Sequence, residues 1–240
     1  MEALVMLALI DGDLVLYRCA ASAENDSLDI AKARVNELLD QILEAISATE
    51  YRFFLSGKKN FRKQIYPEYK ANRTQPKPVH LSDLREWACE ELNAEVTEHS
   101  LEADDYLGIY QDKTEGSTTI CTLDKDLLMI PGNHYQWQFG TSKWTKDAKR
   151  LYQSEIEGLR LFYEQCLKGD KADNVKGIAG LGDAKARKLL AGCTTEKEML
   201  EVCLELYGHE EEFLLNAQCL WILQGFDHYY LERFDELRYG

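Results

Sequence analysis

Acidic residues recur in four short clusters, each at a point where an apolar run ends or a helix could begin. The clusters are Asp11, Glu102-Asp104-Asp105, Asp124-Asp126 and Asp170-Asp173. Oxygen ligands brought together from distant segments suit hard cations such as Mg²⁺ or Mn²⁺, and so many like charges would repel one another without a cation. The pattern predicts a metal site. The alternative is a solvated acidic surface on a chain of net charge −14.

A basic segment runs from Lys58 to Lys77 and contains seven lysines and arginines against one acid, Glu68. Its basic residues are Lys58, Lys59, Arg62, Lys63, Lys70, Arg73 and Lys77. An enzyme that acts on phosphodiesters needs such a segment beside acidic metal ligands, because the strand must be attracted while cations hold the phosphate. The alternative is a solvated basic helix.

Three glycines, Gly177, Gly180 and Gly182, precede a helix expected from Ala184 to Leu190. Their spacing permits a tight turn with exposed backbone amides, and the helix that follows presents its N-terminus to an anion. A phosphate backbone suits that position. The alternative is a turn that serves packing alone.

The elements that must position these residues alternate between strand and helix over the first two thirds of the chain. Hydrophobic patterning predicts strands over residues 4–10, 51–55, 95–98, 118–123 and 135–139, and helices over 29–46, 79–92 and 102–110. Such alternation predicts a parallel sheet covered on both faces. Asp11 and Asp124 each follow a strand, so they can converge at the carboxyl edge of the sheet. Beyond about Gln153 the pattern is helical.

Composition limits the class of protein. The 240 residues are 45% hydrophobic, enough for a substantial core in one large domain or in a domain with a smaller appendage. The seven cysteines are odd in number and widely spread, which favours a reducing cytoplasm over a disulfide framework. No apolar stretch approaches membrane-spanning length.

Five motifs occur in a fixed order over roughly residues 4–190. They are Leu9-Ile10-Asp11-Gly12, Phe61-Arg62 with Tyr66 to Arg73, Glu102-Ala103-Asp104-Asp105, Asp124-Lys125-Asp126-Leu127, and Gly169 to Asn174 with the three glycines. This series resembles the signatures of the 5′-nuclease family, which comprises flap endonucleases and 5′→3′ exonucleases. The opening Asp11-Gly12-Asp13 and the compact size resemble the exonucleases of T7-like bacteriophages most.

The resemblance implies an α/β fold with a PIN-like parallel-sheet nuclease core. The core would span residues 1–165, with a helical arch at about 58–92. A helical region would follow over residues 166–240, with a helix–three-turn–helix, a motif of the helix-hairpin-helix type, at about 170–192.

The resemblance also implies a two-metal site for Mg²⁺, with Mn²⁺ as an alternative. The first ion would be held by Asp11, Glu102, Asp104 and Asp124, and the second by Asp126, Asp170 and Asp173, with Asp105 contributing directly or through water. The catalytic set would be Asp11, Lys70 and Arg73. DNA contacts would come from Arg62, Tyr69, Lys70, Arg73, Gly177, Gly180, Gly182 and Lys185, with Tyr69 stacking on a terminal base and the glycine turn holding K⁺.

The implied activity is divalent-metal-dependent 5′→3′ exodeoxyribonuclease activity with flap endonuclease activity. The partners would be DNA with free 5′ ends, nicks, gaps or flaps, and RNA in RNA/DNA hybrids, and the protein would be a cytoplasmic monomer without a membrane, in the host cytoplasm if a phage encodes it. One position departs from the family. Ser56 stands where relatives commonly carry an aspartate, which removes a carboxylate from the neighbourhood of the metals.

Two other classes of function fit part of the pattern. Asp11-x-Asp13-x-Val15, Ser56 and Asp170-x-x-Asp173 approximate the motifs of haloacid-dehalogenase-like phosphatases, with Asp11 as the nucleophile. That hypothesis gives no role to Glu102, to Asp124-x-Asp126 or to the glycine turn. The other class is a non-catalytic DNA-binding module, in which buried carboxylates without cations would only reduce stability.

Overall fold

The centre of the molecule is a six-stranded sheet in the order β3-β2-β1-β4-β5-β8. The computed structural model describes residues 6–111, 116–141 and 143–240. The strands of the sheet are β1 (Leu7–Asp11), β2 (Glu50–Leu55), β3 (Glu95–Val96), β4 (Thr118–Cys121), β5 (Gly132–Gln136) and β8 (Lys149–Gln153). Neighbouring strands are parallel except for β5 and β8, which are antiparallel. The predicted parallel sheet is confirmed, with an antiparallel edge strand that the sequence did not indicate.

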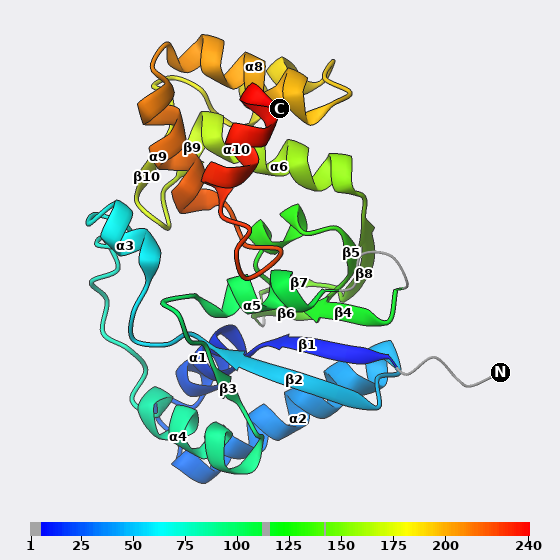
Figure 1. The fold of residues 1–240 in the computed structure, drawn as a ribbon. Helices are drawn as coiled ribbons and strands as arrows, with labels where there is room; N and C mark the ends of the chain where they lie inside the picture. Colours follow the sequence, from blue (N-terminus) through cyan, green and yellow to red (C-terminus); the bar gives the residue numbers. More distant parts are fainter. Residues whose placement is uncertain (1–5, 112–115, 142) are drawn as a thin grey trace, which may run out of the picture.

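Helices cover both faces of this sheet (Figure 1). On one face lie α1 (Gly12–Ser22), α2 (Leu28–Ile46) and α4 (Leu81–Glu91), and on the other lie α5 (Ala103–Tyr110) and α6 (Glu155–Lys168). Alternate residues of β1 point to opposite faces of the sheet. Ala8 and Ile10 pack in the cluster that contains α1, whereas Leu9 packs in the cluster that contains α5. The central strand is therefore buried on both faces and reads as a continuous apolar run.

The chain after α6 is mainly helical, as predicted. It contains α7 (Asp183–Leu190), α8 (Glu196–Tyr207), α9 (Glu210–Leu220) and α10 (Tyr230–Tyr239), together with the short hairpin of β9 (Gly169–Asp170) and β10 (Val175–Lys176). Ring contacts join Phe162 of α6 to Trp221 and Tyr230. The helix α6 runs through the predicted domain boundary at residues 165 and 166, and one hydrophobic cluster continues across it.

The segment expected to form a helical arch, residues 58–92, contains two separate helices. The first is the short α3 (Phe61–Ile65), and the second is α4, whose buried Leu84 and Ala88 belong to the cluster shared with α1 and α2. Residues 66–80 between the two helices form turns and irregular chain. Only part of the segment is therefore helical, and its second helix packs against the body of the protein.

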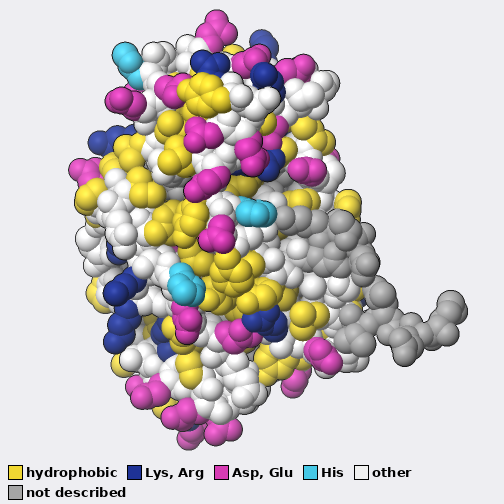
Figure 2. Space-filling model, in the orientation of Figure 1, with side chains coloured by type: hydrophobic (Ala, Val, Ile, Leu, Met, Phe, Trp, Pro, Cys, Tyr) yellow, Lys and Arg dark blue, Asp and Glu magenta, His cyan; other side chains and the backbone are white. Residues whose placement is uncertain are grey.

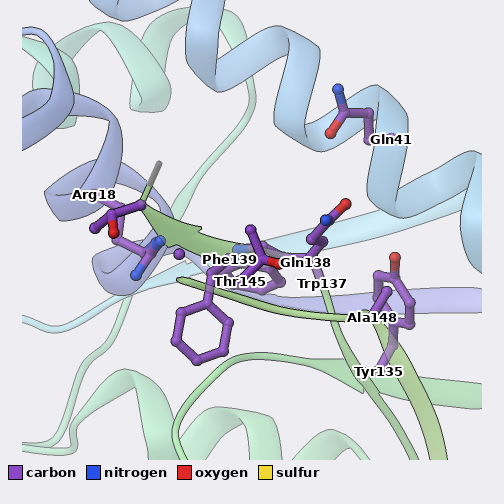
Figure 3. A pocket seen from close by; sticks show the side chains of 10 residues that line it. Arg18, Gln41, Tyr135, Trp137, Gln138, Phe139, Thr145 and Ala148 are labelled. Atoms are coloured by element: carbon purple, nitrogen blue, oxygen red, sulfur yellow. The ribbon is translucent and has the colours of Figure 1, made fainter. Parts of the chain in front are cut away.

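A second antiparallel hairpin, β6 (Phe139–Thr141) with β7 (Trp144–Lys146), follows β5. A pocket of about 490 Å³ lies between this hairpin, α1 and α2, with Arg18, Gln41 and Trp137 among its lining residues (Figure 3). No residue of the four acidic clusters lines it. The pocket is therefore separate from the candidate metal site. Over the described ranges, none of the helices combines the length and apolar character that crossing a membrane requires.

Candidate metal and nucleic-acid site

Acidic side chains are scattered over the molecular surface in Figure 2, as expected for a net charge of −14. A metal site must therefore be recognised by burial and mutual proximity, because acidity alone is common here. Members of the four clusters differ from this surface acidity: several are buried, and the charge of one carboxylate raises the pKa of another.

The first group consists of Asp11 at the end of β1, Asp104 in the first turn of α5, and Asp124 just beyond β4. Asp11 accepts hydrogen bonds from the Leu14 amide (3.0 Å) and the Thr122 hydroxyl (2.6 Å). Burial raises the pKa of Asp11 to about 7, and the charge of Asp124 adds to the effect. Burial, followed by the charges of Asp11 and Asp124, also raises the pKa of Asp104 well above its usual value. Asp11 is buried and Asp104 half-buried, whereas Asp124 is exposed and acts on both of them through its charge.

The second group consists of Asp126, Asp170 and Asp173. Asp126 begins a 3-10 helix, η1 (Asp126–Met129), and its amide donates to the Asp124 carboxylate at 2.9 Å. Burial raises the pKa of Asp126 to about 7, and the charges of Asp124, Asp170 and Asp173 contribute. Asp170 ends β9 and accepts the amides of Ala172 (2.6 Å) and Asp173 (3.2 Å). Because Asp124 influences members of both groups, it lies between them.

We expect the metal-free protein to unfold at a higher temperature at about pH 5 than at about pH 8. Asp11 and Asp126 have pKa values of about 7 in the folded state, against about 3.9 for an unfolded aspartate. The folded state then binds more protons than the unfolded state between these values, so the free energy of unfolding falls as pH rises. Melting curves in EDTA at the two pH values measure this, and Mg²⁺ should remove most of the fall. A melting temperature that rises with pH in EDTA would contradict the burial of these groups.

Glu102 is the N-cap residue of α5 and behaves differently from its neighbours. Burial acts to raise the pKa of Glu102, but the Arg62 guanidinium and the Lys70 ammonium outweigh it and lower this pKa to about 2. Lys70 Nζ lies 2.5 Å from one carboxylate oxygen of Glu102, and the Tyr69 hydroxyl lies 2.9 Å from the other. Glu102 is therefore ionised and is already engaged by protein donors.

Asp105 is fully buried and is saturated with protein partners. Its two carboxylate oxygens accept hydrogen bonds from the two terminal nitrogens of Arg62, at 2.8 and 2.7 Å. They also accept the backbone amides of Glu102 (2.9 Å) and Leu223 (3.2 Å). The prediction that Asp105 contributes to metal binding is therefore wrong for this arrangement, because its lone pairs serve a buried salt bridge.

Arg62 was predicted to contact DNA, and the structure corrects this too. Its side chain is only 2% exposed. Besides Asp105, it donates to the carbonyls of Cys219 (3.0 Å) and Trp221 (2.5 Å), so it joins α3 to α5 and to the end of α9. Every donor that could reach a phosphate faces the interior instead. Sequence patterning missed this because a single arginine in a basic segment resembles its exposed neighbours.

Tyr69 is buried as well, with 2% of its surface exposed. Its hydroxyl lies 2.9 Å from Glu102 and 2.8 Å from Asp173. The predicted stacking of this ring on a terminal base is therefore not possible in this conformation. Tyr69 instead connects a carboxylate of α5 with a carboxylate of the 170–174 loop.

Lys70 and Arg73, the other predicted members of the catalytic set, both lie at the acidic clusters. Lys70 is mostly buried, whereas the Arg73 side chain is 57% exposed and pairs with Asp173 at 2.7 Å. The Arg73 side chain also donates to the Ala172 carbonyl at 3.3 Å. Arg73 is thus the basic group of this pair that solvent, and hence a phosphate, can reach.

The three glycines have different roles. A Cβ atom at Gly177 would come within 2.2 Å of backbone atoms of Lys168 and Gly169, so close packing requires a glycine there, and its DNA contact stays a prediction. Gly180 has a φ of +78° and Gly182 is the N-cap residue of α7; both are exposed, with open space where a Cβ would be. Lys185 is exposed too, and its ammonium donates to the Gly180 carbonyl at 3.0 Å.

Ser56 faces the start of α5. Its hydroxyl accepts the Ala103 amide at 2.9 Å, and its own amide donates to Asp13 at 2.9 Å. Asp13 is also paired with Arg85. Both carboxylate oxygens of Asp13, a residue of the motif on which the phosphatase hypothesis rests, are therefore engaged by protein donors. The Asp13–Arg85 pair and the Thr122 contact with Asp11 were missed, because no spacing rule joins such distant residues.

The donor set suits a hard divalent cation, since it consists of carboxylates and includes the buried Asp11 and the half-buried Asp104, which repel each other. Among the residues that the structure describes, no three His, Cys, Asp or Glu side chains already form a ligand group for one ion. Several carboxylates are instead held by Thr122, Tyr69, Lys70 and Arg73. Metal binding would therefore require these side chains to exchange partners.

Comparisons with known proteins agree with the fold and show the family. Residues 6–156 match the family described as 5'-3' exonuclease, N-terminal resolvase-like domain. The chain is 29% identical over 217 residues to the 5'-3' exonuclease of Bacillus subtilis (strain 168), covering 81% of this chain and 73% of that protein. It is 28% identical over 193 residues to the flap endonuclease Xni of Shewanella sp. (strain MR-4), covering 76% and 73%.

A solved structure has a similar fold. The T5 D15 protein, co-crystallised with metal ions, superposes with a TM-score of 0.65 at 14% identity, covering 89% of this chain and 88% of that one. At this identity the likeness concerns the fold alone.

Proposed function

The chain belongs to the 5′-3′ exonuclease family, as its motifs predicted, and we propose that it hydrolyses DNA from 5′ ends in a reaction that requires divalent metal ions. Flap endonuclease activity is part of the proposal, because a flap endonuclease is among its relatives. The observation that carries the proposal is the meeting of two groups of neighbouring carboxylates, which include Asp11 at the end of β1 and Asp124 just beyond β4, beside the exposed Arg73.

We assign the first ion to Asp11, Glu102, Asp104 and Asp124, and the second to Asp126, Asp170 and Asp173. Two bound Mg²⁺ ions would activate a water molecule and stabilise the departing 3′-oxygen. The structure supports carboxylates as the ligands, since burial raises the pKa values of Asp11, Asp104 and Asp126 and a nearby cation would lower them again. Mn²⁺ is the alternative ion.

The protein's own cations would orient the DNA. Arg73 is exposed beside Asp173, so its guanidinium can draw the scissile phosphate toward the carboxylates. On the other side of the site, Gly180, Gly182 and Lys185 would meet the duplex backbone at the N-terminus of α7. K⁺ at this turn, activity on RNA/DNA hybrids, a monomeric state, a cytoplasmic location and a phage origin stay predictions.

The test uses 5′-labelled single-stranded, duplex, nicked and flap substrates with Mg²⁺, followed by separation of the products by length. We expect short 5′-labelled products from duplex and nicked DNA, and a product of flap length from the flap substrate. No cleavage should occur in EDTA. Removal of nucleotides from the 3′ end, or cleavage that persists in EDTA, would contradict the proposal. The phosphatase alternative instead predicts hydrolysis of small aryl phosphates and a phosphorylated Asp11.

Gly182→Val should weaken duplex binding several-fold without destabilising the protein. Gly182 has extended backbone angles that valine adopts readily, and no protein atom lies within 4 Å of the added Cβ. A branched side chain would instead stand between the N-terminus of α7 and the phosphates that approach it. Binding is measured in Ca²⁺ with duplex and single-stranded DNA.

The matched control for this variant is Gly192→Val, which also places its Cβ in open space, beyond the other end of α7. Equal affinity in both variants and wild type would show that the turn does not approach the duplex.

A further inference from the structure

Lys70 has an unusual backbone conformation for a residue with a side chain. Its φ is +56°, in the left-handed region that non-glycine residues rarely adopt. Asn174 has a φ of +58°. The Lys70 amide donates to the Asp173 carbonyl at 2.9 Å, and the Asn174 side chain donates to the Glu68 carbonyl at 2.9 Å. Two strained segments therefore hold each other in place, which is typical of functional sites.

The hydrogen bonds between the segments of Lys70 and Asn174 fix the direction of the Lys70 side chain. Lys70 is 14% exposed, and its ammonium lies 2.5 Å from Glu102 and 3.7 Å from Asp173. The Tyr69 hydroxyl contacts the same two carboxylates, at 2.9 and 2.8 Å. A hydroxyl has one proton and can donate to only one of them. Arg62 also contacts Glu102, and Arg73 also pairs with Asp173, but of these three cations Lys70 is the one that contacts both carboxylates. Its positive charge therefore reduces the repulsion between the carboxylate of Glu102 and that of Asp173 in the 170–174 loop.

We propose that Lys70 is the resident cation of the metal-free site: its ammonium neutralises Glu102 and Asp173 until metal ions bind, and is then released toward the DNA phosphate. The first half concerns only the free protein and its metals. The second half rests on the proposed function. Lys70, which was predicted to contact DNA, would then also set the affinity of the protein for its metal ions.

The charge of Lys70 then has two opposite effects. Without metal, it reduces repulsion among the carboxylates and stabilises the folded protein. With metal, it competes for Glu102 and Asp173, so it weakens binding. A lysine that only contacted DNA would have neither effect, because its ammonium would lie in solvent.

The experiment titrates Mn²⁺ into the DNA-free protein by calorimetry and records melting curves in EDTA. Lys70→Met keeps most of the length of the unbranched side chain and removes its charge. We expect it to bind Mn²⁺ about ten-fold more tightly than wild type, the order of effect of one unit charge beside a partly buried cation. It should also melt at a lower temperature than wild type in EDTA. Lys63→Met is the matched control, because Lys63 is exposed on α3, and it should change neither quantity.

Lys70→Gly provides the second variant should Lys70→Met not fold, because glycine adopts the positive φ without strain and also removes the charge. Mn²⁺ affinity equal to or weaker than wild type in the folded neutral variant would overturn the proposal. Wild-type protein that binds no Mn²⁺ would instead overturn the metal site itself. Wild-type protein that binds Mn²⁺ and cleaves DNA, with unchanged affinity in the variant, would remove only the role of Lys70.

Discussion

Asp124→Asn should reduce Mg²⁺-dependent cleavage by at least about 1,000-fold, the order of rate that metal-ion stabilisation of the transition state supplies. Asp124 lies between the two groups of carboxylates, since its charge acts on Asp11 and Asp104 as well as on Asp126. Its loss should therefore disturb both assigned ion positions. Duplex affinity in Ca²⁺ should stay the same or increase, because one negative charge near the phosphates is removed.

The control for Asp124→Asn is Asp40→Asn, which removes the same charge from an exposed position on α2. Cleavage rates of the two variants and of wild type are compared at saturating Mg²⁺. Wild-type activity in Asp124→Asn, or an equal loss in Asp40→Asn, would contradict the assignment of the carboxylates to the metals.

Arg62→Met should lower the free energy of unfolding by about 3–5 kcal/mol, the usual loss when one partner of a buried ion pair is removed. The substitution would leave the Asp105 carboxylate buried without its cation, and the carbonyls of Cys219 and Trp221 without their donor. Urea unfolding, followed by circular dichroism, measures the change.

A surface pair provides the comparison. Arg34 pairs with Asp26 at 2.8 Å with more than a third of each side chain exposed, so Arg34→Met should cost less than about 1 kcal/mol. Adding Asp105→Leu to Arg62→Met should recover part of the lost stability, because no unpaired charge then remains in the interior. A loss as small as that of Arg34→Met would show that Arg62 does not join α3, α5 and α9 in solution.

The sequence predicted the framework of the site because the framework follows from local rules. Asp11 and Asp124 each follow an apolar strand, and parallel strands bring their carboxyl ends to one edge. The helix after Glu102 was predicted to begin with carboxylates in its first turn, and its start is fixed by a capping box between Glu102 and Asp105. Strand alternation, helix spacing and capping act over a few residues, so a single sequence contains them.

Side-chain burial in the basic segment could not be predicted in the same way. Arg62 and Tyr69 are buried because their partners, Asp105, Asp173 and the carbonyls beyond α9, arrive from distant parts of the chain. Arg73, only a few residues away, is exposed. The local sequence around Arg62 does not differ in kind from that around Arg73. Only tertiary packing determines that Arg62 is buried and that Arg73 faces solvent.

The central claim is that the two groups of carboxylates bind two divalent ions, and anomalous diffraction from crystals grown with Mn²⁺ tests it most directly. The account predicts two anomalous peaks, one among Asp11, Glu102, Asp104 and Asp124 and the other among Asp126, Asp170 and Asp173, with the Lys70 ammonium moved away from Glu102. Crystals with Mn²⁺ at saturating concentration and no peak at either group, or with peaks only elsewhere on the acidic surface, would contradict it.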